Sequence, residues 1–312
     1  MGIVIRDKKF PSSTGLGDIR YRVWAPEEPH ACVQLIHGMA EHIERYHDFA
    51  MYLAQNGILV FGMDLPGHGK SVGDGQPLGY FGDHNGWDRL IDDNKTLHDT
   101  VMKDYPSLAC ILFGHSMGSF LARTYAGRKG VDFDAFVFSG TAGANPALPI
   151  AKMIARSAIK KGKGKLPNEQ LNQLSFGTYN KKFKEPRTQF EWLSRDHESV
   201  DRYVADPLCG FTFTSCAFYD LFTGLGEISD LNWAKRVPNR PVLLLSGADD
   251  PVGGMGKGVR QVAKWLSKSG HSVSLKLYPE GRHEMLNELN KQDVYGDVLL
   301  FIETICAAGE LV

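Results

Sequence analysis

One stretch decides the fold: Ala109-Cys110-Ile111-Leu112-Phe113-Gly114-His115-Ser116-Met117-Gly118. Its apolar first half is typical of a buried strand, and the residues that follow Gly118 have the character of a helix. A serine at such a junction adopts a strained backbone, and Gly114 and Gly118 leave the room that side chains would otherwise fill. The sequence therefore predicts that the Ser116 hydroxyl stands exposed above a sheet edge, at the start of a helix.

Further apolar runs lie on both sides of this stretch, and helical patterns separate them. The predicted buried strands are residues 31–36, 58–61, 133–139, 241–246 and 272–278. The helical patterns span residues 43–56, 88–105, 259–267 and 292–307. Strands that alternate with helices pair in parallel through crossovers, so we expect a doubly wound α/β sheet. At the start of the chain, residues 2–10 and 19–24 alternate apolar and polar side chains, which predicts an antiparallel hairpin.

The alternation of strands and helices is interrupted between residues 142 and 237. Helical patterns occur there at residues 150–158, 183–193 and 211–223, without a convincing strand. We therefore expect a core domain made of residues 1–141 and 238–312, and a helical cap inserted as residues 142–237.

Two polar side chains follow later strands in the order that a serine nucleophile requires. The Ser116 hydroxyl needs a base to take its proton and a third group to orient that base. Asp250 follows the strand at 241–246, and His283 follows the strand at 272–278. Pro251 fixes the backbone beside Asp250, which favours Asp250 as the acid, although spacing alone leaves the adjacent Asp249 open. The pattern predicts a Ser116–His283–Asp250 triad.

An acyl-transfer site also needs donors for the oxyanion that develops on the attacked carbonyl. These are usually the N–H of the residue after the nucleophile and an N–H from the loop after an earlier strand. In this chain those groups are the backbone N–H of Met117 and of Met39, which follows His37-Gly38. We expect these two to form the oxyanion hole.

With these residues in place, the chain resembles the α/β-hydrolase fold serine hydrolases of the monoacylglycerol lipase, lysophospholipase and serine aminopeptidase type. The matching segments are residues 35–42, 64–71, 114–119, 247–252 and 281–288. The resemblance implies the α/β-hydrolase fold, with a mostly parallel, eight-stranded, doubly wound sheet and a helical cap. It also implies a serine nucleophile, an acyl-enzyme intermediate and no cofactor.

The resemblance suggests carboxylic esters with an apolar acyl chain as substrates, monoacylglycerol or lysophospholipid being the first to try. Amide or peptide cleavage by the same triad is the alternative, and a non-catalytic binding protein on this scaffold is a third reading. Aromatic residues of the cap could line an acyl tunnel, although many must pack the cap on the sheet: Phe176, Tyr179, Phe183, Phe190, Trp192, Phe211, Phe213, Phe218, Tyr219 and Phe222. Acyl-chain length, head group and oligomeric state stay open.

The composition excludes other classes of partner. A net charge of −1 gives no basic field for nucleic acid. Five cysteines without C-x-x-C spacing argue against a zinc site or a disulfide framework and indicate a reducing, cytoplasmic location. We expect no metal site at His37, His42 and His47, which have no metal-binding pattern. The glycine-rich residues 253–258 lack the P-loop pattern and are interpreted as a loop before a helix.

Membrane contact is open on the sequence. No stretch approaches the roughly 20 apolar residues of a membrane span. The cap contains the basic run Lys160-Lys161-Gly162-Lys163-Gly164-Lys165, which could attract an anionic membrane surface or form a solvated loop. Peripheral contact through the cap is therefore one hypothesis.

Overall fold

One sheet of eight strands runs through the part of the chain that the computed structural model describes, residues 2–183 and 185–309. Residues 1 and 310–312, the outer ends of the expected core domain, lie outside the described residues. The strands are β1 (Ile3–Pro11), β2 (Asp18–Pro26), β3 (Ala31–Ile36), β4 (Ile58–Met63), β5 (Ala109–His115), β6 (Ala135–Ser139), β7 (Val242–Gly247) and β8 (Val273–Tyr278). Their order across the sheet is β1-β2-β4-β3-β5-β6-β7-β8.

The sheet is parallel except at its first edge. β1 pairs antiparallel with β2, and β2 pairs antiparallel with β4, so the predicted hairpin is confirmed. All pairings from β4 through β3, β5, β6 and β7 to β8 are parallel. The mostly parallel α/β fold predicted from the sequence is confirmed.

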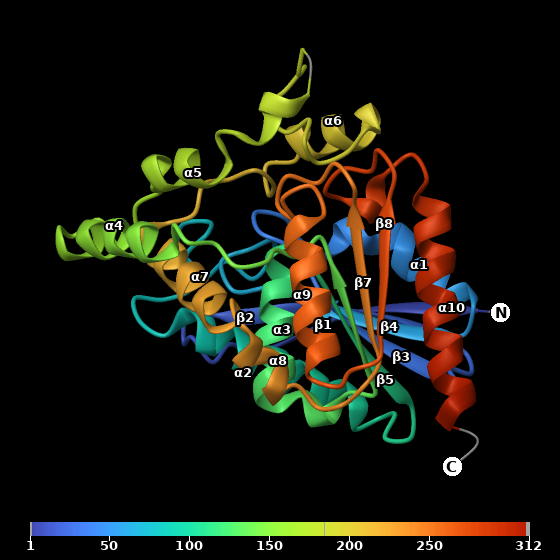
Figure 1. Cartoon of the computed structure of the whole chain (residues 1–312). Helices are drawn as coiled ribbons and strands as arrows, with labels where there is room; N and C mark the ends of the chain where they lie inside the picture. The colour runs from blue at the N-terminus through green and yellow to red at the C-terminus, as the bar shows by residue number, and fades with distance from the viewer. Residues whose placement is uncertain (1, 184, 310–312) are drawn as a thin grey trace.

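Helices cover both faces of this sheet (Figure 1). The 3-10 turn η1 (Ile43–Tyr46), α1 (His47–Gln55) and α10 (Lys291–Gly309) lie on one face; α2 (Gly86–Met102), α3 (Met117–Lys129) and α9 (Lys257–Lys268) lie on the other. Strand β5 shows why its sequence is a continuous apolar run. Ile111 and Phe113 pack under α1 and α10, whereas Cys110 and Leu112 pack toward α2 and α3.

The predicted insertion carries the remaining helices, and Figure 1 shows α6 above the end of β7, with α5 and α4 farther to the left. The elements are α4 (Leu148–Lys160), α5 (Glu169–Phe176), the 3-10 turn η3 (Tyr179–Lys182), α6 (His197–Ala205), α7 (Ser215–Glu227) and α8 (Leu231–Arg236). Two further 3-10 turns, η2 (Gly130–Asp132) and η4 (Met285–Asn287), lie outside the insertion. The helical patterns at 150–158 and 211–223 correspond to α4 and α7.

The prediction of a helix at residues 183–193 is wrong. The described part of this segment forms turns rather than a helix. Tertiary hydrogen bonds hold it instead: the Asn180 side chain donates to the carbonyl oxygen of Thr188 (2.7 Å) and accepts from the N–H of Trp192 (3.0 Å). The Thr188 hydroxyl also accepts from the N–H of Phe190 at 3.1 Å, a local bond that competes with helix formation.

Three helices of the insertion were not predicted from the sequence, although each begins at a capping side chain. Asn168, Asp196 and Asp230 accept hydrogen bonds from the first backbone N–H groups of α5, α6 and α8, respectively. Such residues are strong helix-start signals. Among the described residues, no helix is both long enough and apolar enough to cross a membrane.

Candidate active site

Ser116 lies at a sharp turn between β5 and α3, as predicted. Its backbone has φ 53° and ψ −123°, a conformation that a non-glycine residue adopts only under strain. A β-carbon on Gly114 would lie 2.3 Å from the carbonyl oxygen of Gly118, and one on Gly118 would lie 2.2 Å from that of Ile36. Glycine is therefore required on both sides of the serine.

Asp250 and His283 meet at the carboxyl ends of β7 and β8. Both carboxylate oxygens of Asp250 lie 3.0 Å from Nδ1 of His283. The same carboxylate accepts hydrogen bonds from the Val252 N–H (2.8 Å) and the Ser246 hydroxyl (3.2 Å), which fix its orientation. Asp250 is fully buried, whereas Asp249 is exposed, so the geometry favours Asp250 over its neighbour.

The protonation of the two groups is coupled. Burial alone would lower the pKa of the His283 imidazole, but the charge of Asp250 and the hydrogen bond to it outweigh burial and raise that pKa above its usual value. His115 lies beside this pair, with its ring centroid 4.8 Å from that of His283. Burial and the neighbouring His283 lower the pKa of His115 to about 4, so His115 stays neutral.

The loop after β3 lies against the serine. A β-carbon on Gly38 would be 3.1 Å from Cβ of Ser116, so the backbone that leads into Met39 passes directly beside the candidate nucleophile. Met117 is the first residue of α3, and its N–H consequently has no acceptor within the helix. His37 shapes this loop: one ring nitrogen accepts from the Leu65 N–H (2.9 Å), and the other lies 2.8 Å from the Gly38 carbonyl oxygen.

A buried ion cluster joins this loop to the His283 loop. The Arg45 guanidinium donates to both oxygens of Glu284, each at 2.7 Å, and to Glu41 at 2.5 Å. The Glu41 carboxylate in turn accepts from the Gly38 N–H (2.5 Å) and the Tyr46 hydroxyl (2.7 Å). The charge and hydrogen bonds of Arg45 outweigh burial and lower the pKa of Glu284 to about 2. This cluster fixes the peptide next to Met39.

The segment after η3 is hydrogen-bonded to the loop that carries His283. The backbone N–H of His283 donates to the Trp192 carbonyl oxygen (3.3 Å), and that of Glu284 donates to the Leu193 carbonyl oxygen (2.7 Å). The buried carboxylate of Glu288 accepts from the backbone N–H of both Arg195 (3.1 Å) and Arg282 (2.8 Å). Part of the insertion therefore supports the loop that carries the imidazole.

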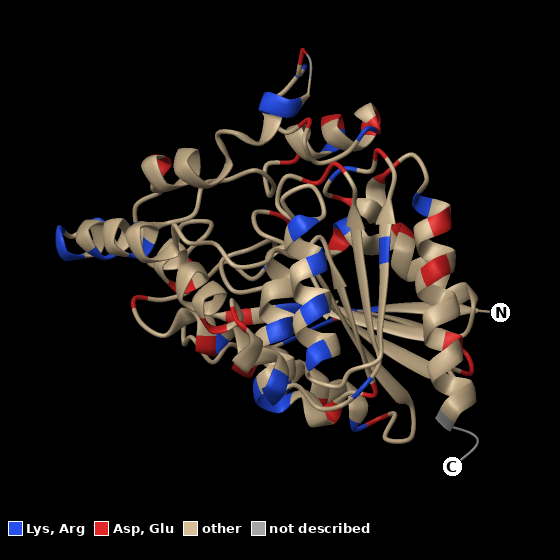
Figure 2. Cartoon of the chain, in the orientation of Figure 1, with Lys and Arg blue, Asp and Glu red and all other residues tan. Residues whose placement is uncertain are grey.

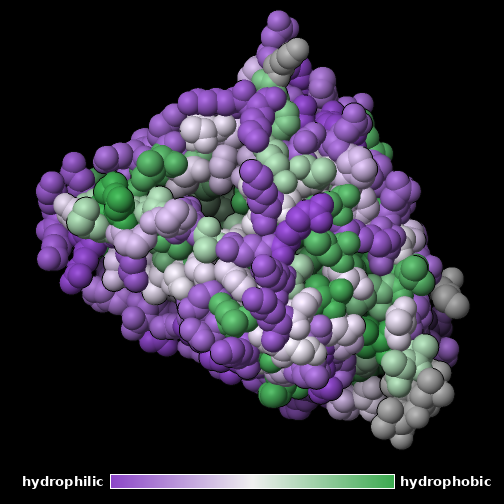
Figure 3. All heavy atoms as spheres, viewed as in Figure 1, coloured by the Kyte–Doolittle hydropathy of each residue, from purple (hydrophilic) through white to green (hydrophobic). Residues whose placement is uncertain are grey.

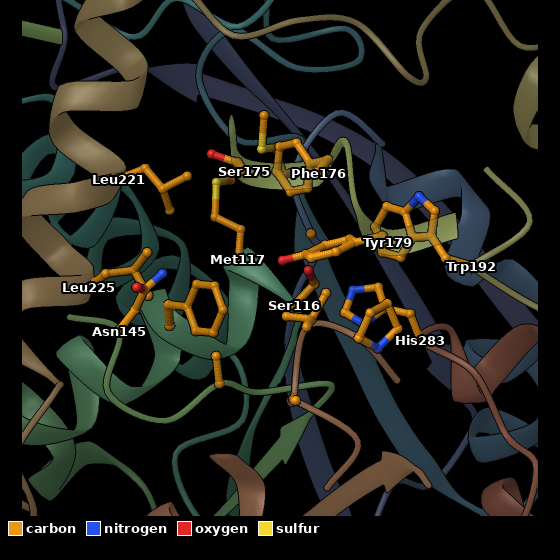
Figure 4. Close-up of a pocket in the computed structure, with 18 of the residues that line it drawn as sticks. Ser116, Met117, Asn145, Ser175, Phe176, Tyr179, Trp192, Leu221, Leu225 and His283 are labelled. Atoms are coloured by element: carbon orange, nitrogen blue, oxygen red, sulfur yellow. The ribbon is translucent and has the colours of Figure 1, made fainter. Parts of the chain in front are cut away.

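A cavity of about 910 Å³ opens over Ser116, and both Ser116 and His283 line it. Figure 4 shows the two side chains close together at its floor, with Leu221 and Leu225 on one side and Tyr179 and Trp192 on the other. The volume is at the upper end of the range usual for small-molecule sites. Its apolar lining residues include Met117, Phe120, Leu148, Ala151, Phe176, Leu221, Phe222 and Leu225.

Some of the cap aromatic residues predicted to line an acyl tunnel do line the cavity, and others pack in the core. Phe176, Tyr179, Phe190, Trp192, Phe211 and Phe222 line the cavity. Phe213 and Phe218 are fully buried in the core beneath it. The glycine-rich residues 253–258 lead into α9, as predicted, and four of them form part of the cavity rim.

One group of possible metal ligands was not predicted. His42 lies with Asp206 and Cys209, whose ligand atoms are all within 4.8 Å of one another. The His42 ring nitrogen is 2.8 Å from the Asp206 carboxylate, so these two side chains already satisfy each other as a pair between the β3 loop and the end of α6.

The structure thus brings together Ser116, Asp250, His283, Met39 and Met117, and their catalytic roles stay a prediction. Sequence reasoning missed Glu41, Arg45 and Glu288. The i, i+4 spacing of Glu41 and Arg45 directly after His37-Gly38 was the available signal for the first two. The partner of that pair, Glu284, lies far away along the chain.

Known proteins resemble this chain in sequence and in fold. A family model described as "Serine aminopeptidase, S33" matches residues 27–290. The chain is 31% identical over 303 residues to a monoacylglycerol lipase of Mycolicibacterium smegmatis, covering 93% of this chain and 95% of that protein. It is 31% identical over 271 residues to the monoglyceride lipase of Homo sapiens, covering 86% of this chain and 80% of that protein. A solved carboxyl esterase from Bacillus coagulans, in complex with glycerol, matches with a TM-score of 0.92 at 31% identity, covering 98% of this chain and 100% of that one.

Proposed function

This chain belongs to the α/β-hydrolase family described as serine aminopeptidase, S33, and we propose that it acts on lipid esters that carry one acyl chain, with monoacylglycerol as the first candidate. The chain is an enzyme, a carboxylic ester hydrolase. That activity argues against a non-catalytic binding protein on this scaffold. The proposal of a lipid substrate is supported by the apolar side chains of α3, α4 and α7 that line the cavity over Ser116.

In the proposed mechanism, the Ser116 hydroxyl attacks the ester carbonyl while Nε2 of His283 takes its proton. Asp250 holds the other nitrogen of the imidazole and stabilises the imidazolium. The N–H groups of Met39 and Met117 bind the oxyanion. Collapse of the tetrahedral intermediate breaks the bond to the alcohol, which leaves with the proton of His283. Water, deprotonated by His283, then releases the fatty acid from Ser116.

One observation carries this proposal. A buried Asp250–His283 pair and a strained serine face one cavity, and its lining residues from α3, α4 and α7 are apolar. An apolar wall stabilises an acyl chain by removing its surface from water, worth about 25 cal/mol per Å². The site is therefore suited to an ester whose acid part is a hydrocarbon chain.

Amide or peptide cleavage is less well supported. An aminopeptidase needs a free carboxylate to hold the substrate amine. Within the described residues, the only carboxylates that line the cavity are Glu41 and Glu284, and both are ion-paired with Arg45. The geometry consequently favours esters.

We also propose that the cap contacts membranes. Ile150 and Met153 of α4 and Leu174 of α5 are exposed, and Figure 3 shows apolar surface over these helices next to the hollow that leads into the cavity. The basic run at residues 160–165 lies at the end of α4, where the ribbon in Figure 2 is blue, and α9 carries a further row of cations. Apolar and cationic side chains together favour an anionic lipid surface.

Vesicles test the membrane proposal. Sedimentation with vesicles of phosphatidylcholine plus phosphatidylglycerol should bind the protein more strongly than phosphatidylcholine alone, and salt should weaken the binding. Replacing Lys160, Lys161, Lys163 and Lys165 by glutamine should reduce it. Equal binding by this variant and the wild type would exclude the basic run as the contact.

The division into a core (1–141 and 238–312) and a cap (142–237) is likewise a proposal. α4 and α5 lie around the cavity, which supports a cap there. α8, at the end of the inserted range, packs on α3 and α9, and its Trp233 donates to the carbonyl oxygen of Arg123 at 2.6 Å. A cytoplasmic location stays a prediction from cysteine usage.

Hydrolysis of p-nitrophenyl esters with two to sixteen carbons tests the function. The wild type should prefer medium or long chains, and Ser116→Ala should lose the activity. Ser175→Ala, a second serine of the cavity wall, is the matched control and should keep it. A preference for acetate would contradict the lipid-ester proposal, and undiminished activity in Ser116→Ala would contradict the proposed nucleophile.

A further inference from the structure

The position of His283 indicates which side of the cavity receives the alcohol part of an ester. The imidazole must protonate the oxygen of the departing alcohol, and proton transfer requires that oxygen within hydrogen-bond reach of Nε2. The alcohol therefore leaves along the wall next to His283. The acyl chain then binds along the opposite wall of the cavity, where Leu221 and Leu225 lie in Figure 4.

Aromatic rings from the insertion form the wall next to His283. The Trp192 ring centroid lies 5.1 Å from that of His283, at an interplanar angle of 40°. Tyr179 packs edge-on against Trp192, with centroids 5.0 Å apart, and against Phe176 at 5.6 Å. These contacts, together with the hydrogen bond from the Trp192 N–H to Asn180, fix the orientation of the Tyr179 ring.

The Tyr179 hydroxyl is a polar group without a protein partner. Figure 4 shows it pointing toward the Ser116 side chain, and Tyr179 lines the cavity. None of the described residues forms a hydrogen bond with it, whereas the buried Tyr46 and Tyr203 hydroxyls donate to Glu41 and to the Ala40 carbonyl oxygen. Because Tyr179 lines the cavity, a bound molecule that displaces water from this hydroxyl has to supply its partner. Burial also raises the pKa of Tyr179, so the hydroxyl stays a donor at neutral pH.

We propose that the Tyr179 hydroxyl hydrogen-bonds a free hydroxyl group on the alcohol part of the ester, and so selects esters of polyols such as glycerol over esters of simple alcohols. The inference rests on the proposed lipid-ester hydrolysis and adds a specificity residue to it. An ester of a simple alcohol that displaces water from the Tyr179 hydroxyl leaves this hydroxyl unpaired, which costs free energy. An ester with a neighbouring hydroxyl satisfies it.

The test compares two esters of the same acid, 1-octanoylglycerol and ethyl octanoate, below their aggregation limits. Tyr179→Phe keeps the ring contacts with Trp192 and Phe176 and removes only the oxygen. We expect kcat/KM for the glycerol ester to fall roughly three- to tenfold, the loss that one neutral hydrogen bond predicts. The value for the ethyl ester should not fall. The control, Tyr219→Phe on α7, changes a cap tyrosine that does not line the cavity.

The outcomes separate this inference from the function on which it rests. The decisive quantity is kcat/KM for 1-octanoylglycerol divided by kcat/KM for ethyl octanoate. A decrease of this ratio in Tyr179→Phe, with no change in Tyr219→Phe, supports the inference. An unchanged ratio in Tyr179→Phe, or an equal loss for both esters, overturns it while ester hydrolysis stands. If the wild type hydrolyses neither octanoyl ester faster than Ser116→Ala, the proposed function fails and the inference fails with it.

Discussion

Gly38 lies so close to Ser116 that a β-carbon on Gly38 would be 3.1 Å from Cβ of Ser116 and 2.6 Å from Oε1 of Glu41. The second contact is with the carboxylate that accepts the Gly38 N–H. A side chain at residue 38 must therefore displace the Glu41 carboxylate, which holds the loop before Met39, and it presses against Ser116.

Gly38→Ala should consequently lower kcat. Loss of one oxyanion donor costs roughly 10²- to 10³-fold in kcat, and we expect a decrease up to that size. Steady-state kinetics with a p-nitrophenyl ester measures it. The control is Gly226→Ala in α7, where an added β-carbon meets no atom within 4 Å. Wild-type kcat in Gly38→Ala would contradict the placement of the oxyanion loop.

The adjacent residues Asp249 and Asp250 allow a test of which carboxylate orients His283. Asp250→Asn should reduce kcat by about 10⁴-fold, because an amide cannot hold the imidazole in the required tautomer or stabilise its charge. Asp249→Asn should stay close to wild type, since Asp249 is exposed and its side chain makes no hydrogen bond with the imidazole. The reverse order of effects would assign the role to Asp249.

The raised pKa of His283 predicts the pH dependence of catalysis. A general base must be neutral, so kcat/KM should increase with pH, with a midpoint above the ordinary histidine value of about 6.5. Removing the Asp250 charge should move this midpoint to lower pH. The rate profile of wild type and Asp250→Asn between pH 5 and 9 checks both statements, and a wild-type midpoint well below the ordinary value would refute the first.

Arg45 should be important for stability. Arg45→Met leaves Glu41 and Glu284 buried without their cation, a loss that costs about 3–5 kcal/mol of unfolding free energy. Urea denaturation at neutral pH measures it. Arg202→Met removes a solvent-exposed i, i+4 pair with Glu198 and should change the unfolding free energy very little.

The same cluster gives a pH test of stability. The pKa of Glu284 is lowered to about 2, so its contribution is present above the usual glutamate pKa and is lost as pH falls toward 2. In Arg45→Met the buried carboxylates would take up protons more readily in the folded state. Over the acid range, the variant should therefore become more stable as pH falls while the wild type becomes less stable. If the unfolding free energies of the two proteins changed with pH in parallel, the stabilising role of the Arg45 cluster would be contradicted.

The core of this fold was predictable because its central strands are short apolar runs, and β5, β6 and β7 end at a histidine, a serine and a glycine, respectively. Residues 109–118 show the relationship: burial on both faces makes β5 apolar, and the turn requires Gly114 and Gly118. Asp250 and His283 could be predicted with Ser116, because parallel strands place their carboxyl ends at one edge.

The insertion was less predictable because long-range hydrogen bonds determine its conformation. Residues 183–193 show a helical pattern, yet Asn180 and the His283 loop hold the described part of the segment in turns. The Arg45 cluster likewise depends on Glu284, and the meeting of the two follows from the topology and not from local sequence. Tyr179 was identifiable as a cap aromatic, but the orientation of its hydroxyl follows from the packing of Trp192.

The most direct test of the account is covalent labelling of the nucleophile. We predict that a fluorophosphonate adds one adduct per chain, that peptide mapping places it on Ser116, and that Ser116→Ala takes up none. Ester hydrolysis should disappear in step with labelling. An adduct on another residue, or sustained hydrolysis by a protein fully labelled at Ser116, would contradict the assignment of Ser116 as the catalytic serine.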